Sequence, residues 1–264
     1  MRRFLPVALL AGVAVVAAMQ SATAQTSSPA QRVPGVTPAL PAQKPYAVVK
    51  VAIPTAAPDP VFDALRKELG EIAKRKDRAA LAQRVATRDF FWERDFGGNF
   101  DPARSSSDNL ASALALENDD GWDTLLGFAT EASVGPLPGR PSVICSPAIP
   151  QFDDEARNKL VDSTGTDGVD WSYPRAAGLA MRAAPQPNSP VVETLGMHLV
   201  HVLGYEEKEG EMDPLRTAWL RVAAPSGKAG FVAPNTLISS YTDRLCYAKA
   251  GTAWRIVGYV GGGD

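Results

Sequence analysis

Residues 218–232 read AWLRVAAPSGKAGFV, and this stretch decides the fold that we expect for the C-terminal half of the chain. Its two apolar runs, 218–222 and 229–232, flank Pro225-Ser226-Gly227-Lys228, a sequence typical of a turn. Similar short runs, separated by Pro, Gly and Asn, precede this hairpin over residues 179–203. Five or six short strands with this spacing indicate a small β-barrel.

The motifs in this region also follow a familiar order. An Arg precedes a Pro-containing loop at residues 181–185, Trp219 opens a strand, and a Gly turn leads to Gly230-Phe231-Val232. Over about residues 179–238 this order resembles the bacterial SH3-like domain of exported proteins. Phe231 stands where that family usually has Trp, and the loop at 204–216 is longer than usual. The resemblance implies a module that binds a cell-wall peptide, binds a protein or only packs beside a neighbour.

The segment before the barrel has a helical pattern. Asp59-Pro60 can cap and start a helix, and Val61, Leu65, Leu69 and Ile72 then repeat at three to four residues. We therefore expect an α+β protein with a mainly helical domain over 59–165. A barrel over 172–260 follows, in which the C-terminal hairpin 245–260 extends the barrel or docks it on the helices.

The N-terminus has the features of a secretory signal peptide. Arg2 and Arg3 precede an apolar run of about 15 residues, and Ala22-Thr23-Ala24 is a small-x-small cleavage site. The alternative is an uncleaved anchor, but a membrane span needs about 20 apolar residues. We expect residues 1–24 to be removed, residues 25–58 to form a Pro-rich mobile tether, and the mature protein to be periplasmic or secreted with no integral membrane span.

Export affects how the two cysteines are interpreted. An oxidising compartment allows Cys145 and Cys246 to form a disulfide, which we expect to tie the two halves together. The alternative is a pair of buried free thiols that act as small apolar side chains.

Composition and charge exclude several classes of function. The chain has 264 residues, 45% of them hydrophobic, and a formal net charge of −2, which becomes −4 without Arg2 and Arg3. Such a chain lacks the clustered cations of a nucleic-acid-binding protein. Two Cys and two His are too few for a Cys- or His-rich metal framework, and no phosphate or dinucleotide loop is present. The sequence predicts no metal and no cofactor.

Catalytic motifs are also weak. Cys145 with His198 or His201 is the only Cys–His combination, but Ile144-Cys145-Ser146-Pro147 differs from the Asp-Cys-Ser-Gly motif that opens a helix in cell-wall peptidases of the NlpC type. Carboxylate pairs for glycoside cleavage need not be neighbours in sequence. Glu93 and Asp95, inside the aromatic run 89–100, are the best candidates for such a pair.

The sequence thus favours a non-catalytic extracytoplasmic module that recognises a cell-wall peptide or an envelope protein. We expect its ligand contacts to be the rings of Tyr205, Trp219 and Phe231 near the barrel loops. The alternatives are a peptidoglycan-directed hydrolase with acidic residues in the helical half, and a structural or inhibitory subunit.

Overall fold

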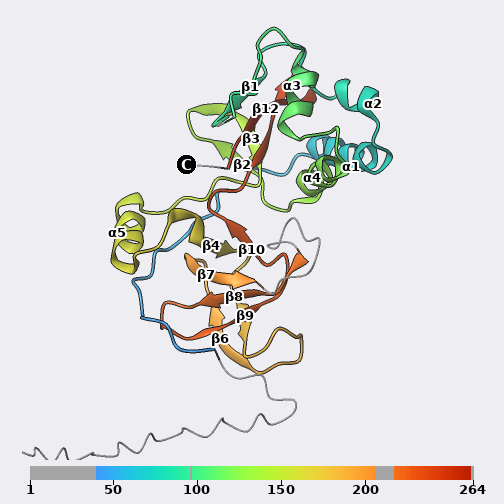
Figure 1. Ribbon diagram of the computed structural model, residues 1–264. Helices are drawn as coiled ribbons and strands as arrows, with labels where there is room; N and C mark the ends of the chain where they lie inside the picture. The colour runs from blue at the N-terminus through green and yellow to red at the C-terminus, as the bar shows by residue number, and fades with distance from the viewer. Residues whose placement is uncertain (1–39, 96, 206–216, 263–264) are drawn as a thin grey trace, which may run out of the picture. The chain divides into compact units, whose positions relative to one another are not determined.

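The computed structural model describes residues 40–95, 97–205 and 217–262 (Figure 1). Thr37–Asp264 form one compact unit. The expected signal peptide, the first part of the expected tether and the loop at 206–216 lie outside the described residues.

The described residues form an α+β fold. Its α-helices are α1 (Pro60–Arg75), α2 (Arg78–Ala82), α3 (Ser106–Ala113), α4 (Asp119–Thr130) and α5 (Asp154–Thr164). A short 3-10 helix at Gly168–Asp170 leads into the second of two β-sheets.

Helix α1 begins where its sequence predicts. The Asp59 side chain accepts hydrogen bonds from the backbone N–H groups of Val61 and Phe62, and Pro60 takes the first helical position. The predicted stripe needs one change, because Val61 is 51% exposed whereas Phe62 is buried. Asp77 and Asp153 cap α2 and α5 in the same way.

The first sheet has five strands in the order β1-β12-β11-β3-β2. They are β1 (Phe91–Glu93), β2 (Gly135–Leu137), β3 (Arg140–Ser146), β11 (Arg244–Ala250) and β12 (Ala253–Val260). Strand β1 runs parallel to β12, and the other pairs are antiparallel. We expected a mainly helical domain over 59–165, but three strands of this sheet come from that segment.

The C-terminal hairpin belongs to this first sheet. The expectation that it extends the barrel is therefore wrong, and the other expectation, that it docks on the helices, agrees with the packing. Tyr247, Trp254 and Ile256 of the hairpin are buried in one core with Phe62 and Leu69 of α1. The apolar face of an amphipathic helix needs such a partner, and here the hairpin provides it.

The second sheet has seven strands in the order β10-β4-β7-β8-β9-β5-β6, all antiparallel, and it curls as half a barrel (Figure 1). Its strands are β4 (Trp171–Pro174), β5 (Leu179–Arg182), β6 (Val191–Leu195), β7 (Val200–Tyr205), β8 (Leu220–Ala223), β9 (Ala229–Val232) and β10 (Leu237–Ser239). Met181, Leu195, Leu220 and Val222 form its core.

The second sheet is an insertion into the first. The chain leaves the five-stranded sheet at the end of β3 and returns to it at β11, so α5 and β4–β10 all lie between these two strands. Cys145 and Cys246 are paired in register across β3 and β11 and form the predicted disulfide, which spans 101 residues. Because both cysteines belong to one sheet, the bridge closes the base of the insertion and does not link one sheet to the other.

Residues 40–53 lie within the expected tether, but they are not free of the fold. Val49 and Val51 are buried, and their backbone groups bond to Leu199 and Met197 beside the second sheet. The blue segment in Figure 1 follows this sheet. The apolar side chains of this segment gain more by burial against the sheet than by remaining in water.

Candidate functional site

The three rings predicted to contact a ligand lie on neighbouring strands β7, β8 and β9 or at their ends. Tyr205 is the last residue of β7 and is 41% exposed, whereas Trp219 directly precedes β8 and is half-buried. Phe231 lies in β9 and is only 3% exposed. Of the three, only Tyr205 is exposed, and Phe231 is a core residue.

The position of Phe231 follows from the sheet. All four residues of β9 are buried, because β9 is paired on one side with β8 and on the other with β5. Phe231 lies opposite Arg221 and Arg182 in the two neighbouring strands. Long side chains next to it can cover an aromatic ring with their methylene groups, so an aromatic residue here does not by itself indicate a ligand contact.

The Cys–His combination has no free thiol. Cys145 is oxidised in the disulfide, and a thiolate nucleophile therefore cannot form at this position. His198 accepts a hydrogen bond at Nε2 from the N–H of Gly196, and its Nδ1 lies 3.1 Å from the carbonyl oxygen of Leu199. His201 stacks on Trp171, and burial lowers its pKa. Both histidines thus have structural contacts.

The two acids weighed for glycoside cleavage are also engaged. Glu93 forms an ion pair with Arg140 at 2.9 Å, and Asp95 accepts a hydrogen bond from the backbone N–H of Phe100 at 2.6 Å. These contacts hold β1 and the loop after it.

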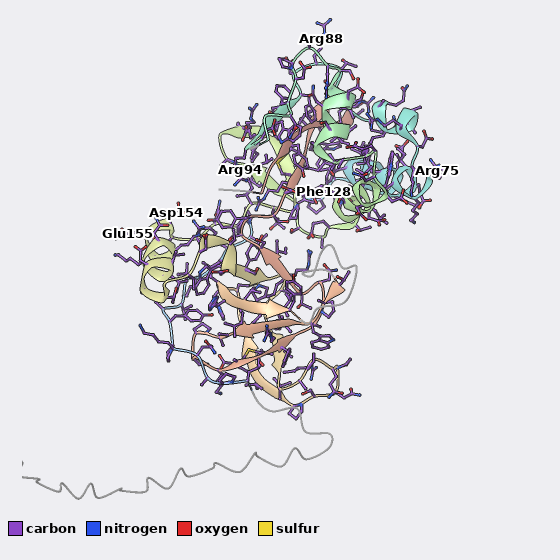
Figure 2. The ribbon with its side chains drawn as sticks, in the orientation of Figure 1. Arg75, Arg88, Arg94, Phe128, Asp154 and Glu155 are labelled. Atoms are coloured by element: carbon purple, nitrogen blue, oxygen red, sulfur yellow. A yellow bond between two sulfur atoms is a disulfide. The ribbon has the colours of Figure 1, made fainter. Side chains whose placement is uncertain are left out.

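No pattern in the sequence indicates the pocket that contains the best-defined polar pair. A pocket of about 380 Å³, which we call the Glu131 pocket, lies between the end of α4 and the loops that precede β10 and β11. It is lined by Thr124, Gly127, Phe128, Thr130, Glu131, Ala132, Pro147, Arg175, Asn235, Thr242 and Asp243. Phe128, labelled in Figure 2, contributes an aromatic wall.

Glu131 is held from several elements. It follows the last turn of α4 and is 8% exposed. Its carboxylate accepts hydrogen bonds from the backbone N–H and the hydroxyl of Ser133, both at 3.0 Å, and it forms an ion pair with Arg175, which follows β4. Arg66 of α1 donates to the Glu131 carbonyl oxygen. A carboxylate and a guanidinium are thereby fixed at the wall of the pocket.

The electrostatics of this pair favour binding over proton transfer. Burial alone would raise the pKa of Glu131, but the hydrogen bonds from Ser133 and the contact with Arg175 outweigh burial and lower it. Glu131 is therefore ionised at neutral pH. A general acid needs a raised pKa, so this carboxylate is suited to hold a cation or to accept hydrogen bonds.

Two further observations concern the part of the chain that the structure describes. No group of three or more His, Cys, Asp or Glu side chains is arranged there to hold a metal ion. None of the described helices combines the length and the apolar character needed to cross a membrane.

Comparison with known proteins adds no identity. No protein-family model, curated protein or solved structure matches this chain.

Proposed function

We propose that this protein is a non-catalytic, extracytoplasmic binding protein that recognises a cell-wall peptide or an envelope protein. The observation that carries the proposal is that the candidate carboxylates are already engaged by other groups of the protein. Glu93 and Asp95 are held by an ion pair and a backbone hydrogen bond, and Glu131 has a lowered pKa. All three carboxylates are thus engaged within the fold, and the lowered pKa of Glu131 does not suit the general acid that hydrolysis of a glycosidic bond requires.

Two other features support the proposal. The first 24 residues have the pattern of a signal peptide, which favours an envelope location. The order of motifs over 179–238 resembles the bacterial SH3-like domain, and the curled antiparallel sheet is compatible with such a module. The exposed ring of Tyr205 at the end of β7 is our candidate contact, with Trp219 beside it.

The test is a pull-down of residues 25–264 with insoluble peptidoglycan, followed by analysis of the soluble fraction for released fragments. Retention without fragments would support the proposal. Released fragments would favour a hydrolase and overturn the non-catalytic part of it. If the wall retains no protein, crosslinking in the envelope must identify a protein partner, and a failure there would overturn the proposal as a whole.

A matched pair of variants locates the contact. Tyr205→Ala should weaken retention by at least about five-fold, because truncating an interface aromatic commonly costs more than 1 kcal/mol. Val191→Ala is the control, since Val191 is 51% exposed on β6 of the same sheet. Equal retention of Tyr205→Ala and the unmodified protein would exclude Tyr205 from the contact.

A further inference from the structure

A second pocket, separate from the Glu131 pocket, is surrounded by arginines. It has a volume of about 390 Å³ and lies beside the N-terminus of α5. We call it the arginine pocket, and its lining residues are Arg94, Ile149, Pro150, Gln151, Phe152, Asp154, Arg157, Ser240, Tyr241 and Arg244. Two of these, Arg94 and Asp154, are labelled in Figure 2. The lining thus includes three arginines and one aspartate.

Arg244 is the deepest of the three cations. It is 1% exposed at the start of β11, and its Nη1 donates to the carbonyl oxygen of Thr242 at 2.7 Å. Its Nε is buried and has no hydrogen-bond partner among the described residues. Burial lowers the pKa of Arg244, and the nearby cation of Arg94 acts in the same direction, whereas Tyr173 and Asp243 act against them. A buried guanidinium with an unused donor is costly unless an anion or another acceptor reaches it.

Arg157 is held in place by aromatic rings. Its guanidinium carbon lies 5.0 Å from the ring centre of Tyr241 and 5.7 Å from that of Phe152. Its Nε is also buried without a hydrogen-bond partner among the described residues. Stacking on rings fixes the plane of a guanidinium while its N–H groups remain able to bind oxygen atoms.

Arg94 and the N-terminus of α5 form the remaining part of the pocket wall. Arg94 follows β1 with a φ of 54°, an unusual backbone conformation for a residue with a side chain. The first turn of α5 presents backbone N–H groups at the positive end of the helix dipole. Asp154 in that turn is the carboxylate among the lining residues.

We propose that the arginine pocket binds a small organic oxyanion, a carboxylate or a phosphate ester. The planar guanidinium groups match the oxygen atoms of either group in a bidentate manner. The pocket is larger than a single such group, and Ile149, Pro150 and Phe152 provide an apolar wall for the organic part of the ligand. This inference goes beyond the proposed function, because it uses neither Tyr205 nor the Glu131 pocket.

The experiment titrates residues 25–264 with glycerol 3-phosphate and, separately, with succinate, at an ionic strength fixed with sodium chloride. Calorimetry and the melting temperature are recorded together. One of the two anions should bind at a single site and raise the melting temperature with its concentration, as linkage requires. Binding of the phosphate ester alone would assign the site to phosphate, and binding of succinate alone would assign it to carboxylates.

The variants Arg94→Gln and Arg157→Gln should each weaken this binding about ten-fold, the usual size of one lost charge-assisted hydrogen bond. Arg88→Gln is the matched control. It removes the same charge, and Arg88 is exposed and lies outside the pocket. Arg244→Gln is kept as a secondary variant, since a change at a buried residue can prevent folding. The proposal is overturned if neither anion binds more tightly than chloride, or if folded Arg94→Gln and Arg157→Gln bind as tightly as Arg88→Gln.

Discussion

Tyr46 packs edge-on against Trp171, with ring centres 5.0 Å apart, and its hydroxyl donates a hydrogen bond to the carbonyl oxygen of Ala223 at 2.7 Å. The same hydroxyl accepts a longer bond from the backbone N–H of His201. Tyr46 thereby joins the N-terminal segment to β4, β7 and β8 of the inserted sheet. Burial raises its pKa well above the ordinary value.

This relationship predicts a graded loss of stability. Tyr46→Phe removes only the hydroxyl and should lower the free energy of unfolding by about 1 kcal/mol. Tyr46→Ala also removes the ring and should cost about 3–5 kcal/mol. Urea denaturation followed by Trp fluorescence would measure both variants. A Tyr46→Ala protein as stable as the unmodified chain would mean that residues 40–53 do not contribute to folding.

Phe231 and Tyr205 should respond in opposite ways to truncation. Phe231→Ala leaves a cavity in β9 and should lower the free energy of unfolding by about 3–5 kcal/mol, whereas Tyr205→Ala should change it by less than about 0.5 kcal/mol. Thermal denaturation by circular dichroism tests the pair. Similar melting temperatures for the two variants would contradict the core position of Phe231.

The Glu131–Arg175 pair should make stability depend on pH. The pKa of Glu131 is lower in the folded chain than the ordinary value of 4.5, so its contribution is present above about pH 4.5 and is lost as the pH falls through the folded-state pKa. Glu131→Gln should cost about 1–3 kcal/mol at neutral pH and should flatten this acid dependence.

The control for this prediction is Glu93→Gln. Glu93 forms an exposed ion pair with Arg140, and its loss should cost no more than about 1 kcal/mol. Urea midpoints measured between pH 3 and pH 7 would compare the two variants. If Glu131→Gln and the unmodified protein lost stability in parallel below pH 5, the role assigned to the pair would be wrong.

Loss of the disulfide should also lower stability substantially. A bridge across 101 residues contributes at most about 4–5 kcal/mol through restriction of the unfolded chain. The double variant Cys145→Ala/Cys246→Ala should therefore have a markedly lower melting temperature, and reducing agent should have no further effect on it. Mass spectrometry after alkylation without reduction checks the premise, and two labelled thiols would refute it.

Local signals account for what could be predicted from the sequence. Asp59 caps α1 as predicted, because a short acidic side chain next to a helical stretch needs only its own neighbours. Most of the predicted strand runs in the C-terminal half are strands, for the same reason. The disulfide followed from the number of cysteines and the expected compartment.

Long-range pairing accounts for what could not be predicted. The parallel pairing of β1 with β12 joins residues more than 160 positions apart, and no local pattern marks it. The assignment of the C-terminal hairpin to the first sheet depends on the apolar face of α1, which is distant in sequence. Arg94, Arg157 and Arg244 each have the sequence context of a surface cation, and only the fold brings them to one pocket.

The disulfide at the base of the insertion also determines the path of mechanical load. Tension applied between α1 and β12 would pass from β3 to β11 through the sulfur–sulfur bond, and the chain between Cys145 and Cys246 would lie outside that path. A protease cut within the inserted sheet would likewise leave both pieces covalently joined. The helices and the five-stranded sheet would then keep their covalent continuity even if the inserted sheet were cut.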